Sequence, residues 1–382
     1  MRISMRAAGR LLWLLVLVVL LVTLLMARLP QGRTAIKTLL FIPQVVPTFP
    51  VQPQEWFLPE PVHQEIRFPM ADSTGSADIY RPPDDGRHSA VLLFFGVAPA
   101  PRDDPRVVEL SQALARAGMV VMTLWSERMM EKRLDAEAPN YLVTAFQYLR
   151  SLPYVDPERV GVGGFCVGAS LVTIAAADPR IADEVRFVNS FGGYFNAKDL
   201  VRAIASRQRF YDTSTEPWHP DDLTSEVFTG HLLESLRDPQ ERTQVETLLE
   251  QEIPPPAQLE VLSPQGKAVY GLIRGVPLEE TELYIAQLPE GLQRLLEELS
   301  PSQYVEKLKA RVLIMHDRED ALVPSTESRR LADALTRRGN LHYTEFTLFK
   351  HMDPTRPLGL FSFAKETFKL FWHMYNVLRI AA

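Results

Sequence analysis

The sequence has a single cysteine, Cys166, among its 382 residues. One thiol can form no intrachain disulfide and can supply no cysteine-rich metal site, so both are excluded. The formal net charge of −6 predicts no basic surface of the kind that binds nucleic acid. Apolar residues at 46% and charged residues at 23% are ordinary for a globular protein. The chain is long enough for one large core with an insertion, or for two domains.

A long apolar run stands near the amino terminus. Residues 11–27 are apolar except for Thr23, and three arginines precede them. A helix of this length spans ~25 Å, just enough for a thin bilayer. A cleaved signal peptide begins in the same way, but no convincing small-residue cleavage site follows. We therefore predict a transmembrane anchor in residues 1–30; a buried soluble helix is disfavoured because the run is apolar on every face.

Basic residues flank this run on both sides, with a slight excess on the amino-terminal side. The positive-inside rule then favours a cytoplasmic amino terminus, with the rest of the chain on the extracytoplasmic side of the membrane. Residues 31–61 follow and contain six prolines, at a spacing that opposes helices and central strands. We expect an extended tether there, with residues 39–51 apolar enough to lie on the membrane or on the domain surface.

Strand and helix patterns then alternate. A hairpin is predicted at residues 64–68 and 77–80, with buried strands at 90–95, 120–124, 160–162, 184–189, 311–315 and 342–349. Helices are predicted at residues 106–117, 141–152, 325–338 and 361–380. Continuous apolar strands separated by helices indicate an α/β protein with a doubly wound, mostly parallel sheet.

The alternation stops between residues 196 and 300. Helical patterns occur there, such as residues 232–251 and 291–299, without any buried strand pattern. Residues 211–300 hold eighteen acidic and five basic side chains, a net charge of −13. We predict an acidic helical insertion at residues 196–300. The charge of this insertion has a simpler interpretation too, because charged side chains on helices usually just face solvent.

The most specific signal is Gly164-Phe-Cys-Val-Gly168, which follows an apolar strand and precedes an alanine-rich helix. Glycines two positions either side of a nucleophile allow a sharp turn between strand and helix, with the central side chain pushed clear of the backbone. Cys166 would stand at a helix N-terminus, where the helix dipole favours a thiolate. A buried structural cysteine is the alternative, since free cysteines are commonly buried.

This segment resembles the nucleophile elbow of the α/β-hydrolase superfamily, and its cysteine makes it most similar to the dienelactone hydrolase family. The resemblance covers roughly residues 64–190 and 300–382. It implies an α/β-hydrolase fold whose core is built from residues 62–195 and 301–382. It also implies that the insertion at residues 196–300 forms a cap over the active site.

In this fold the nucleophile, the acid and the histidine follow one another along the chain. The segment His316-Asp-Arg-Glu-Asp-Ala-Leu-Val-Pro324 resembles the family's His-Gly-x-x-Asp-x-x-Val-Pro, which makes Asp320 the acid. Asp317 stands where the family usually has glycine, and Asp317 and Glu319 are the competing carboxylates. A metal site built from His316, Asp317 and Asp320 would match no spacing motif, so neither a metal nor a cofactor is predicted.

The general base is expected after the last strand, and His351 stands there. His316 and His342 belong to strands or strand ends and are poorer candidates. The oxyanion hole needs two backbone N–H groups. The resemblance implies Val167, directly after the nucleophile, and Val97, in the loop after the strand at residues 90–95, with Ala98 as the alternative. The family often has His-Gly in this loop, and Phe95-Gly96 here keeps only the glycine.

The resemblance implies a hydrolase that cleaves a small-molecule ester or lactone through Cys166, His351 and Asp320, and the apolar run near the amino terminus predicts that this hydrolase is anchored in a membrane. Two other functions stay open. A non-catalytic member of the fold could bind a ligand or a protein partner, as the lost loop histidine and Asp317 suggest. The second open function is acyl transfer to an acceptor other than water. An acidic cap that lined the entrance would disfavour polyanionic substrates.

Overall fold

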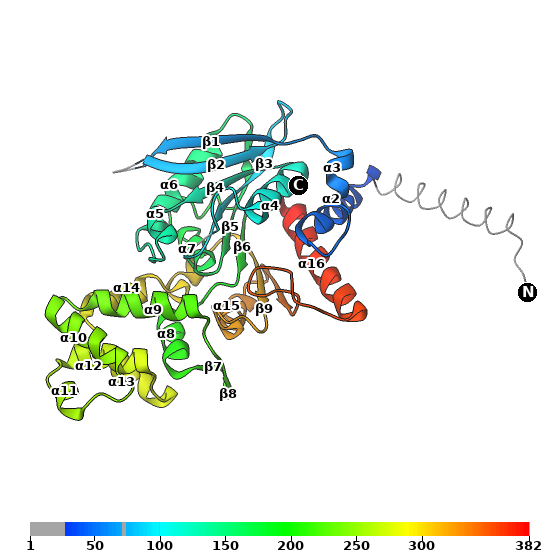
Figure 1. The fold of residues 1–382 in the computed structure, drawn as a ribbon. Helices are drawn as coiled ribbons and strands as arrows, with labels where there is room; N and C mark the ends of the chain where they lie inside the picture. Colours follow the sequence, from blue (N-terminus) through cyan, green and yellow to red (C-terminus); the bar gives the residue numbers. More distant parts are fainter. Residues whose placement is uncertain (1–26, 71–73, 99, 382) are drawn as a thin grey trace, which may run out of the picture.

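The computed structural model describes residues 27–70, 74–98 and 100–381 (Figure 1). The apolar run behind the predicted transmembrane anchor lies outside these residues, apart from its last residue, and the anchor stays a prediction. In the part of the chain that is described, no helix is long and apolar enough to cross a bilayer.

One mixed sheet of eight strands organises the fold. The strands are β1 (Val62–Pro69), β2 (Thr74–Arg81), β3 (His88–Phe94), β4 (Met119–Trp125), β5 (Val155–Phe165), β6 (Phe187–Phe191), β9 (Arg311–Asp317) and β10 (Leu341–Phe346). They lie in the order β1-β2-β4-β3-β5-β6-β9-β10, and β2 is antiparallel to both of its neighbours. All other neighbouring strands run parallel. The predicted mostly parallel sheet is confirmed, and the fold is α/β-hydrolase-like.

Helices cover both faces of this sheet (Figure 1). One face packs against α6 (Ala138–Ser151), α7 (Val167–Ala175) and α15 (Ser325–Thr336), and the other against α4 (Pro105–Arg116) and α16 (Leu360–Ala381). The strand β3 supplies both cores, because successive side chains of a strand point to opposite faces. Leu92 and Phe94 enter the first core, whereas Val91 and Leu93 enter the second.

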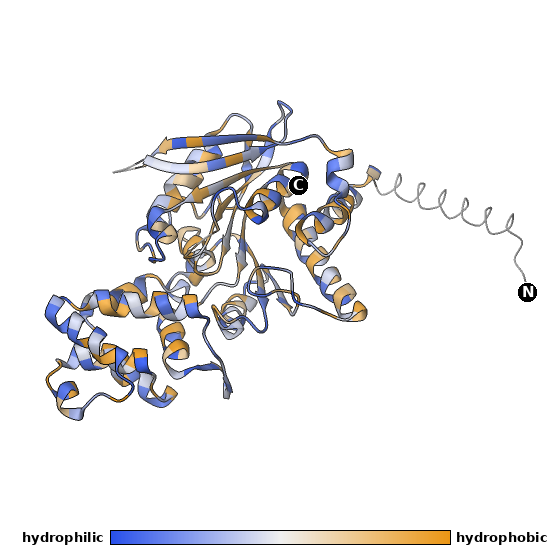
Figure 2. Ribbon diagram, viewed as in Figure 1, coloured by the Kyte–Doolittle hydropathy of each residue, from blue (hydrophilic) through white to orange (hydrophobic). Residues whose placement is uncertain are grey.

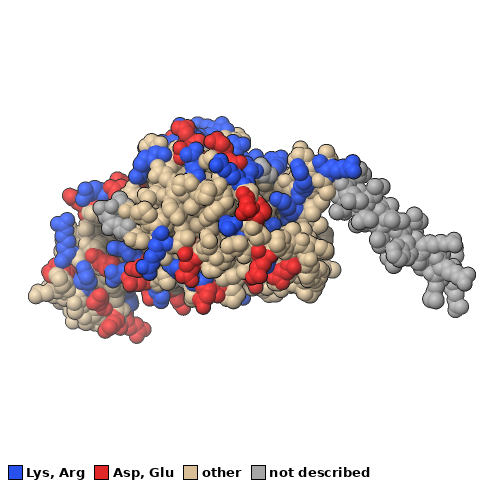
Figure 3. Space-filling view, turned by 90° about the horizontal axis from the view of Figure 1, so that it is seen from above, with Lys and Arg blue, Asp and Glu red and all other residues tan. Residues whose placement is uncertain are grey.

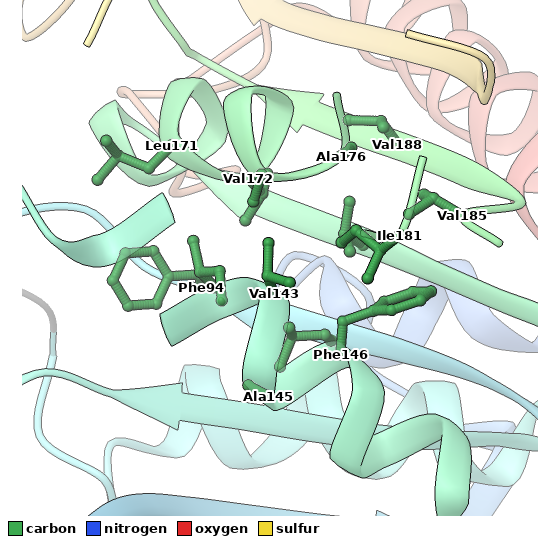
Figure 4. Packing of buried hydrophobic residues seen from close by; sticks show 14 of the residues in the cluster. Phe94, Val143, Ala145, Phe146, Leu171, Val172, Ala176, Ile181, Val185 and Val188 are labelled. Atoms are coloured by element: carbon green, nitrogen blue, oxygen red, sulfur yellow. The ribbon is translucent and has the colours of Figure 1, made fainter. Parts of the chain in front are cut away.

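The core under α6 and α7 holds the elbow in place. Figure 4 shows Val143 of α6 near Phe94 of β3 and Val172 of α7, with Phe146 of α6 on the other side of Val143 from Phe94. All four side chains are at most 1% exposed. Full burial of each such side chain contributes about 1.5–3 kcal/mol relative to an exposed one. This packing fixes α7 against the sheet, and with it the turn that precedes α7.

Between β6 and β9 the chain leaves the sheet and forms the predicted insertion, drawn at the lower left of Figure 1. Its helices are α8 (Ala197–Ser206), α9 (Asp222–Ser235), α10 (Pro239–Glu250), α11 (Pro256–Glu260), α12 (Pro264–Arg274), α13 (Thr281–Ile285) and α14 (Glu290–Glu298), with the short η1 (Leu278–Glu280). Helices η2 (Pro301–Gln303) and η3 (Val305–Lys307) lead back to β9, and α5 (Glu127–Met130) follows β4. The insertion has its own apolar core, which includes Val245, Val269 and Leu272.

Two details of the insertion differ from the sequence predictions. The helix expected at residues 232–251 is two helices, because the Asp238 side chain caps α10 and Pro239 occupies its first turn. A hairpin of β7 (Gln208–Tyr211) and β8 (Ser214–Pro217) also occurs, and none of its residues is buried. A buried-strand pattern could not reveal a hairpin in which no residue is fully buried.

The prediction of an extended tether at residues 31–61 is wrong. This segment contains α2 (Pro30–Val45) and α3 (Pro53–Phe57), each with a proline in its first turn. Proline is favoured there, because its fixed φ suits a helix and its missing N–H would have no partner anyway. The helix α2 packs against α4 and α16, with Phe41 and Ile42 buried. Part of the expectation holds, since the segment does lie on the domain.

Replacing Ile42 tests whether α2 is part of the folded domain. Ile42→Ala is expected to lower the free energy of unfolding by about 2–5 kcal/mol, because Ile42 is 3% exposed. Leu39→Ala is the matched control on the same helix, since Leu39 is 64% exposed, and its effect should stay within about 0.5 kcal/mol. Urea unfolding followed by circular dichroism measures both. Equal stabilities of the two variants would contradict the packing of α2.

Candidate active site

Cys166 occupies a sharp turn between the end of β5 and the start of α7. Its backbone has φ 54° and ψ −139°, a combination that residues other than glycine rarely adopt. The Cys166 N–H donates a hydrogen bond to the carbonyl oxygen of Phe191 at 2.8 Å, which fixes the turn to β6. The side chain is 7% exposed. The strained turn thus places the sulfur at the carboxyl edge of the sheet.

Three glycines allow the backbone to pass at this turn. A Cβ on Gly164 would lie 2.5 Å from the Cα of Ala169, and a Cβ on Gly168 would lie 2.7 Å from the carbonyl group of Phe95. A Cβ on Gly96 would lie 2.7 Å from the Cβ of Cys166. None of these contacts is sterically possible. The glycines therefore let the loop after β3 press directly against the elbow.

Asp320 and His351 come together from separate loops, after β9 and after β10. The Nδ1 of His351 lies 2.8 Å from Oδ2 of Asp320. The other carboxylate oxygen, Oδ1, accepts hydrogen bonds from the backbone N–H groups of Leu322 and Val323. Burial opposes ionisation of Asp320, but the His351 charge and the hydrogen bond from His316 outweigh it, so its pKa lies below the ordinary value. The buried carboxyl is therefore ionised.

The ring of His351 is held in a cationic form. Burial disfavours the imidazolium, but the charge of Asp320, followed by that of Cys166, raises the pKa of His351 well above its usual value. Among the described residues Nε2 has no well-aligned hydrogen-bond partner. The ring and the sulfur are thus close enough to interact electrostatically without a well-formed hydrogen bond. Such bonds are often long in unliganded sites and tighten when substrate binds.

The competing residues have other partners. Asp317 is fully buried and accepts hydrogen bonds from the Phe349 N–H at 3.0 Å and from Nη2 of Arg356 at 2.9 Å. The Arg356 Nε also donates to the Phe349 carbonyl oxygen at 3.0 Å. Asp317 and Arg356 thus clamp both sides of the loop that carries His351. In the sequence, the sign of this role was that Asp317 stands where the family usually has glycine.

The remaining alternatives have partners of their own, and His316 also supports Asp320, whose Oδ2 lies 3.4 Å from its Nε2. Glu319 is on the surface, 3.7 Å from Arg209 and from Arg318. The two ring nitrogens of His316 contact the Ser328 hydroxyl at 2.6 Å and the Val323 carbonyl at 2.9 Å, so this ring has no nitrogen free for a metal. His342 lies in β10, beside Thr344. The described residues contain no cluster of three or more side chains able to hold a metal ion.

Two backbone N–H groups near Cys166 are free to act as donors. Among the described residues neither Val97 nor Val167 donates a hydrogen bond through its N–H. The Ala98 N–H donates to the carbonyl oxygen of Met129 at 2.8 Å, which removes the alternative donor. Val97, Val167 and Cys166 line one pocket. A carbonyl oxygen held between these two donors would lie next to the sulfur.

The insertion covers this pocket. Its volume is about 140 Å³, and its walls come from the elbow and from α8, α9 and α14. The pocket is lined mainly by Leu, Val and Ala side chains, and none of the described residues in its wall is acidic. Acidic side chains of the insertion instead pair with basic ones of the core, as Glu226 does with Lys132 and Glu234 with Arg133.

Hydrogen bonds attach the insertion to the loop that carries Asp320. The Trp218 Nε1 donates to the Asp320 carbonyl oxygen at 2.7 Å, and the Asp221 N–H donates to that of Ala321 at 2.8 Å. The Thr224 hydroxyl donates to the Leu322 carbonyl oxygen at 3.1 Å. These contacts join residues about a hundred positions apart, and no local pattern predicts them. The cap and the acid loop therefore form one connected unit.

One protein-family model matches part of the chain. Residues 110–207, which include the elbow, match the model of the dienelactone hydrolase family. This match supports a hydrolase that acts on ester bonds. No curated protein matches the chain.

Several solved structures are similar to the chain. The 2,6-dihydroxy-pseudo-oxynicotine hydrolase is 15% identical, with 83% of this chain and 68% of that chain covered and a TM-score of 0.49. The esterase from Pyrobaculum calidifontis is 14% identical, with 93% and 97% covered and a TM-score of 0.46. The Pyrococcus horikoshii acylaminoacyl peptidase is 16% identical, with 76% and 37% covered and a TM-score of 0.44. The chain thus spans little more than a third of that peptidase, and substrate must be argued from the site itself.

The Asp320–His351 pair predicts how stability depends on pH. The lowered pKa of Asp320 stabilises the fold above about pH 4, and this contribution is lost as the pH falls further. The raised pKa of His351 stabilises it below about pH 6.5, and this contribution is lost as the pH rises through the folded-state value. The stability difference between wild type and Asp320→Asn should therefore be largest between these limits.

Denaturant unfolding across the pH range measures this difference. Asp183→Asn is the control, because Asp183 is an exposed carboxylate in a surface ion pair with Lys309 and should change stability little at any pH. A difference between wild type and Asp320→Asn that stayed constant with pH would contradict the ion pair.

Proposed function

We propose that the protein is a thiol hydrolase, in which Cys166 attacks the carbonyl carbon of an ester or lactone. The observation that supports this most strongly is the hydrogen-bonded sequence from Asp320 to His351, with the free Nε2 of the ring beside the Cys166 side chain. A nucleophile, a base and a group that orients the base are what this chemistry requires.

Each step uses groups of the chain. The thiolate of Cys166 adds to the carbonyl carbon, and the carbonyl oxygen becomes an oxyanion that accepts hydrogen bonds from the N–H groups of Val97 and Val167. The C–O bond then breaks, and the imidazolium of His351 gives its Nε2 proton to the leaving alcohol. Neutral His351 next takes a proton from water, whose oxygen attacks the thioester. The acid leaves, and the thiolate and the imidazolium are restored.

Asp320 and Asp317 have different tasks in this proposal. Asp320 receives the Nδ1 hydrogen bond and stabilises the imidazolium, so that Nε2 points at the sulfur. Asp317 touches neither reacting group and acts as a positioning residue, because it fixes the two ends of the His351 loop through Phe349 and Arg356. The family's glycine could not make these bonds.

Replacing the nucleophile and the base tests the mechanism. Cys166→Ala and His351→Ala are each expected to lower kcat/KM for short aryl esters and lactones at least about a thousandfold. His63→Ala, on the outermost strand β1, is the matched histidine control and should retain activity. Circular dichroism checks that each variant is folded. Unchanged hydrolysis in both site variants would contradict the mechanism.

Alkylation separates an enzyme from a non-catalytic binding protein of the same fold. Cys166 is the only thiol, so iodoacetamide labelling reports on it directly. We expect fast labelling of wild type and slower labelling of His351→Ala, because the imidazolium favours the reactive thiolate. A folded wild-type protein that is neither labelled nor active would support the alternative that the protein binds a ligand or partner without catalysis.

We further propose that the chain is held at a membrane by residues 1–30, with the described domain on the extracytoplasmic side. The distribution of exposed apolar side chains supports this. Among the residues that the structure describes, nine of the thirteen exposed large apolar ones lie within residues 29–57 and 360–372. The helix α2 packs against both α3 and α16, on the side where the described chain begins (Figure 1). Figure 2 shows the strongly hydrophobic turns of α16 on this side.

Three exposed aromatic side chains of α16 form one stripe. Phe361, Phe368 and Trp372 are spaced by seven and four residues, which places them on one helix face. Basic side chains lie close to the start of the described chain (Figure 3), where Arg28 and Arg33 stand in the sequence. An aromatic face with basic neighbours suits the headgroup region of an anionic bilayer.

Deletion of residues 1–26 is expected to move the protein from the membrane pellet to the soluble fraction, with residual binding to anionic phospholipid vesicles. In that background Phe361→Asp should weaken vesicle binding roughly tenfold or more, since a large apolar side chain can no longer be buried. Ile253→Asp is the matched control, because Ile253 of the insertion and Phe361 are both 86% exposed. Sedimentation with vesicles measures both, and equal losses would contradict this orientation.

A further inference from the structure

A second cavity has Cys166 and the insertion residues Asp221 and Leu223 in its wall, and it extends from there to residues of α2, α4 and α16. Its volume is about 900 Å³, and both Cys166 and His351 belong to its wall. The cavity lies between the sheet and the helices α2, α4 and α16. Alternate residues of the central strands line it, such as Val91 and Leu93 of β3 and Phe187 of β6. It therefore occupies the opposite face of the sheet from α6 and α7.

Aromatic rings form the neck of this cavity, directly below the elbow. Phe165 precedes the nucleophile and stacks on Phe95 at a ring-centroid distance of 4.9 Å. Phe191 lies 5.9 Å from Phe165 and 5.0 Å from Phe349, which is two residues before His351. All four rings line the cavity. A long substrate group that starts at the reacting groups would have to pass between these rings.

Beyond the neck the buried part of the wall is apolar. The helix α16 contributes Leu370, Met374 and Val377, which are spaced as one face of a helix, and α2 contributes Phe41 and Val45. From Phe191 to Phe187 the strand β6 covers ~13 Å, at about 3.3 Å per residue. The cavity is therefore long as well as wide, and its volume is near the upper end of ordinary ligand pockets, about 300–1,000 Å³.

The wall includes charged side chains, such as Arg106, Glu109, Lys350 and Asp353, but all of these are exposed or half-buried. The buried polar groups of the wall identify the chemistry of the part of the occupant that is buried. Asn189 lies inside, but its Oδ1 accepts a hydrogen bond from Nε2 of His373 at 2.9 Å. Among the described residues that line the cavity, the single buried side-chain nitrogen or oxygen without a partner is Nε2 of His351, at the reacting end. A peptide or a sugar would leave its own polar groups unpaired in the buried part of the cavity, whereas a hydrocarbon chain would not.

We propose that this cavity takes the long hydrocarbon chain of an ester substrate, whose carbonyl group stays at Cys166. The inference rests on the proposed function, because the reacting groups define the mouth of the cavity. It also assigns a role to α2 and α16, which separate the hydrocarbon chain of the substrate from the proposed bilayer side of the protein. The small pocket under the cap then receives the short part of the ester.

Two ester series test the proposal on the full chain in lipid nanodiscs, at concentrations below micelle formation. One series carries acyl groups from acetyl to palmitoyl on ethanol, and the other carries acetate on alcohols from ethanol to hexadecanol. In one of the two, kcat/KM is expected to rise about fourfold per buried methylene until the cavity is full. No rise in either series, with short esters still cleaved, would overturn the inference and leave the proposed function intact.

A matched pair of variants places the chain in the cavity. Val377 and Leu378 are neighbours on α16 and both 4% exposed, but only Val377 lines the cavity. Val377→Phe should lower kcat/KM for the longest productive ester about tenfold and move the optimum to shorter chains, because the added ring occupies space that the chain end needs. Leu378→Phe should keep the wild-type chain-length profile. The same profile in both variants would place the chain elsewhere.

Binding to an inactive variant separates the cavity from the catalysis. Cys166→Ala protein in nanodiscs should bind palmitate or hexadecanol, and butyrate at least about a hundredfold more weakly, as titration calorimetry against empty nanodiscs would measure. Long-chain binding without hydrolysis of any ester by wild type would refute the thiol hydrolase and retain the cavity. Absence of long-chain binding to folded Cys166→Ala protein would overturn the cavity assignment.

Discussion

The close approach of three backbone segments at Cys166 is the constraint on which the site depends. The loop after β3, the turn after β5 and the start of α7 meet where Gly96, Gly164 and Gly168 have no Cβ. This approach forces Cys166 into its strained backbone conformation, which costs of order 1–3 kcal/mol. The apolar packing of α6 and α7 on the sheet offsets that cost. Reactive geometry at the sheet edge is therefore maintained by the core beneath it.

The electrostatics of the site follow from burial combined with pairing. Asp320 has no exposed side-chain surface, and its charge is stabilised by two backbone N–H groups and by the rings of His351 and His316. Because this carboxylate stays ionised, the neighbouring ring can hold a proton at neutral pH. The loops that bring the two together are fixed from opposite sides, by Asp317 on the His351 loop and by Trp218 of the cap on the acid loop.

The sequence predicted the parts of this arrangement that depend on local patterns. Apolar runs such as residues 90–95 and 120–124 revealed the central strands, because a buried parallel strand is apolar on both faces. The pattern around Cys166 located the turn, since glycine is required where backbones touch. The clamp between Asp317 and Arg356 joins residues 39 positions apart, and only Asp317's departure from the family pattern hinted at it. The sequence did not reveal α2 because Pro43 lies inside this helix, near its end, where a helix pattern does not place a proline.

The packing of α2 on the domain connects the proposed cavity with the proposed bilayer. As a tether, residues 31–61 would only connect the domain to a membrane. As a helix packed on α4 and α16, the segment closes the apolar cavity with Phe41 and Val45, while Leu39 on its other side faces solvent. One helix thus has an inner face toward the proposed hydrocarbon chain and an outer face toward the proposed bilayer. A substrate that leaves a bilayer would then cross only this layer of helices to reach Cys166, without losing its apolar surroundings.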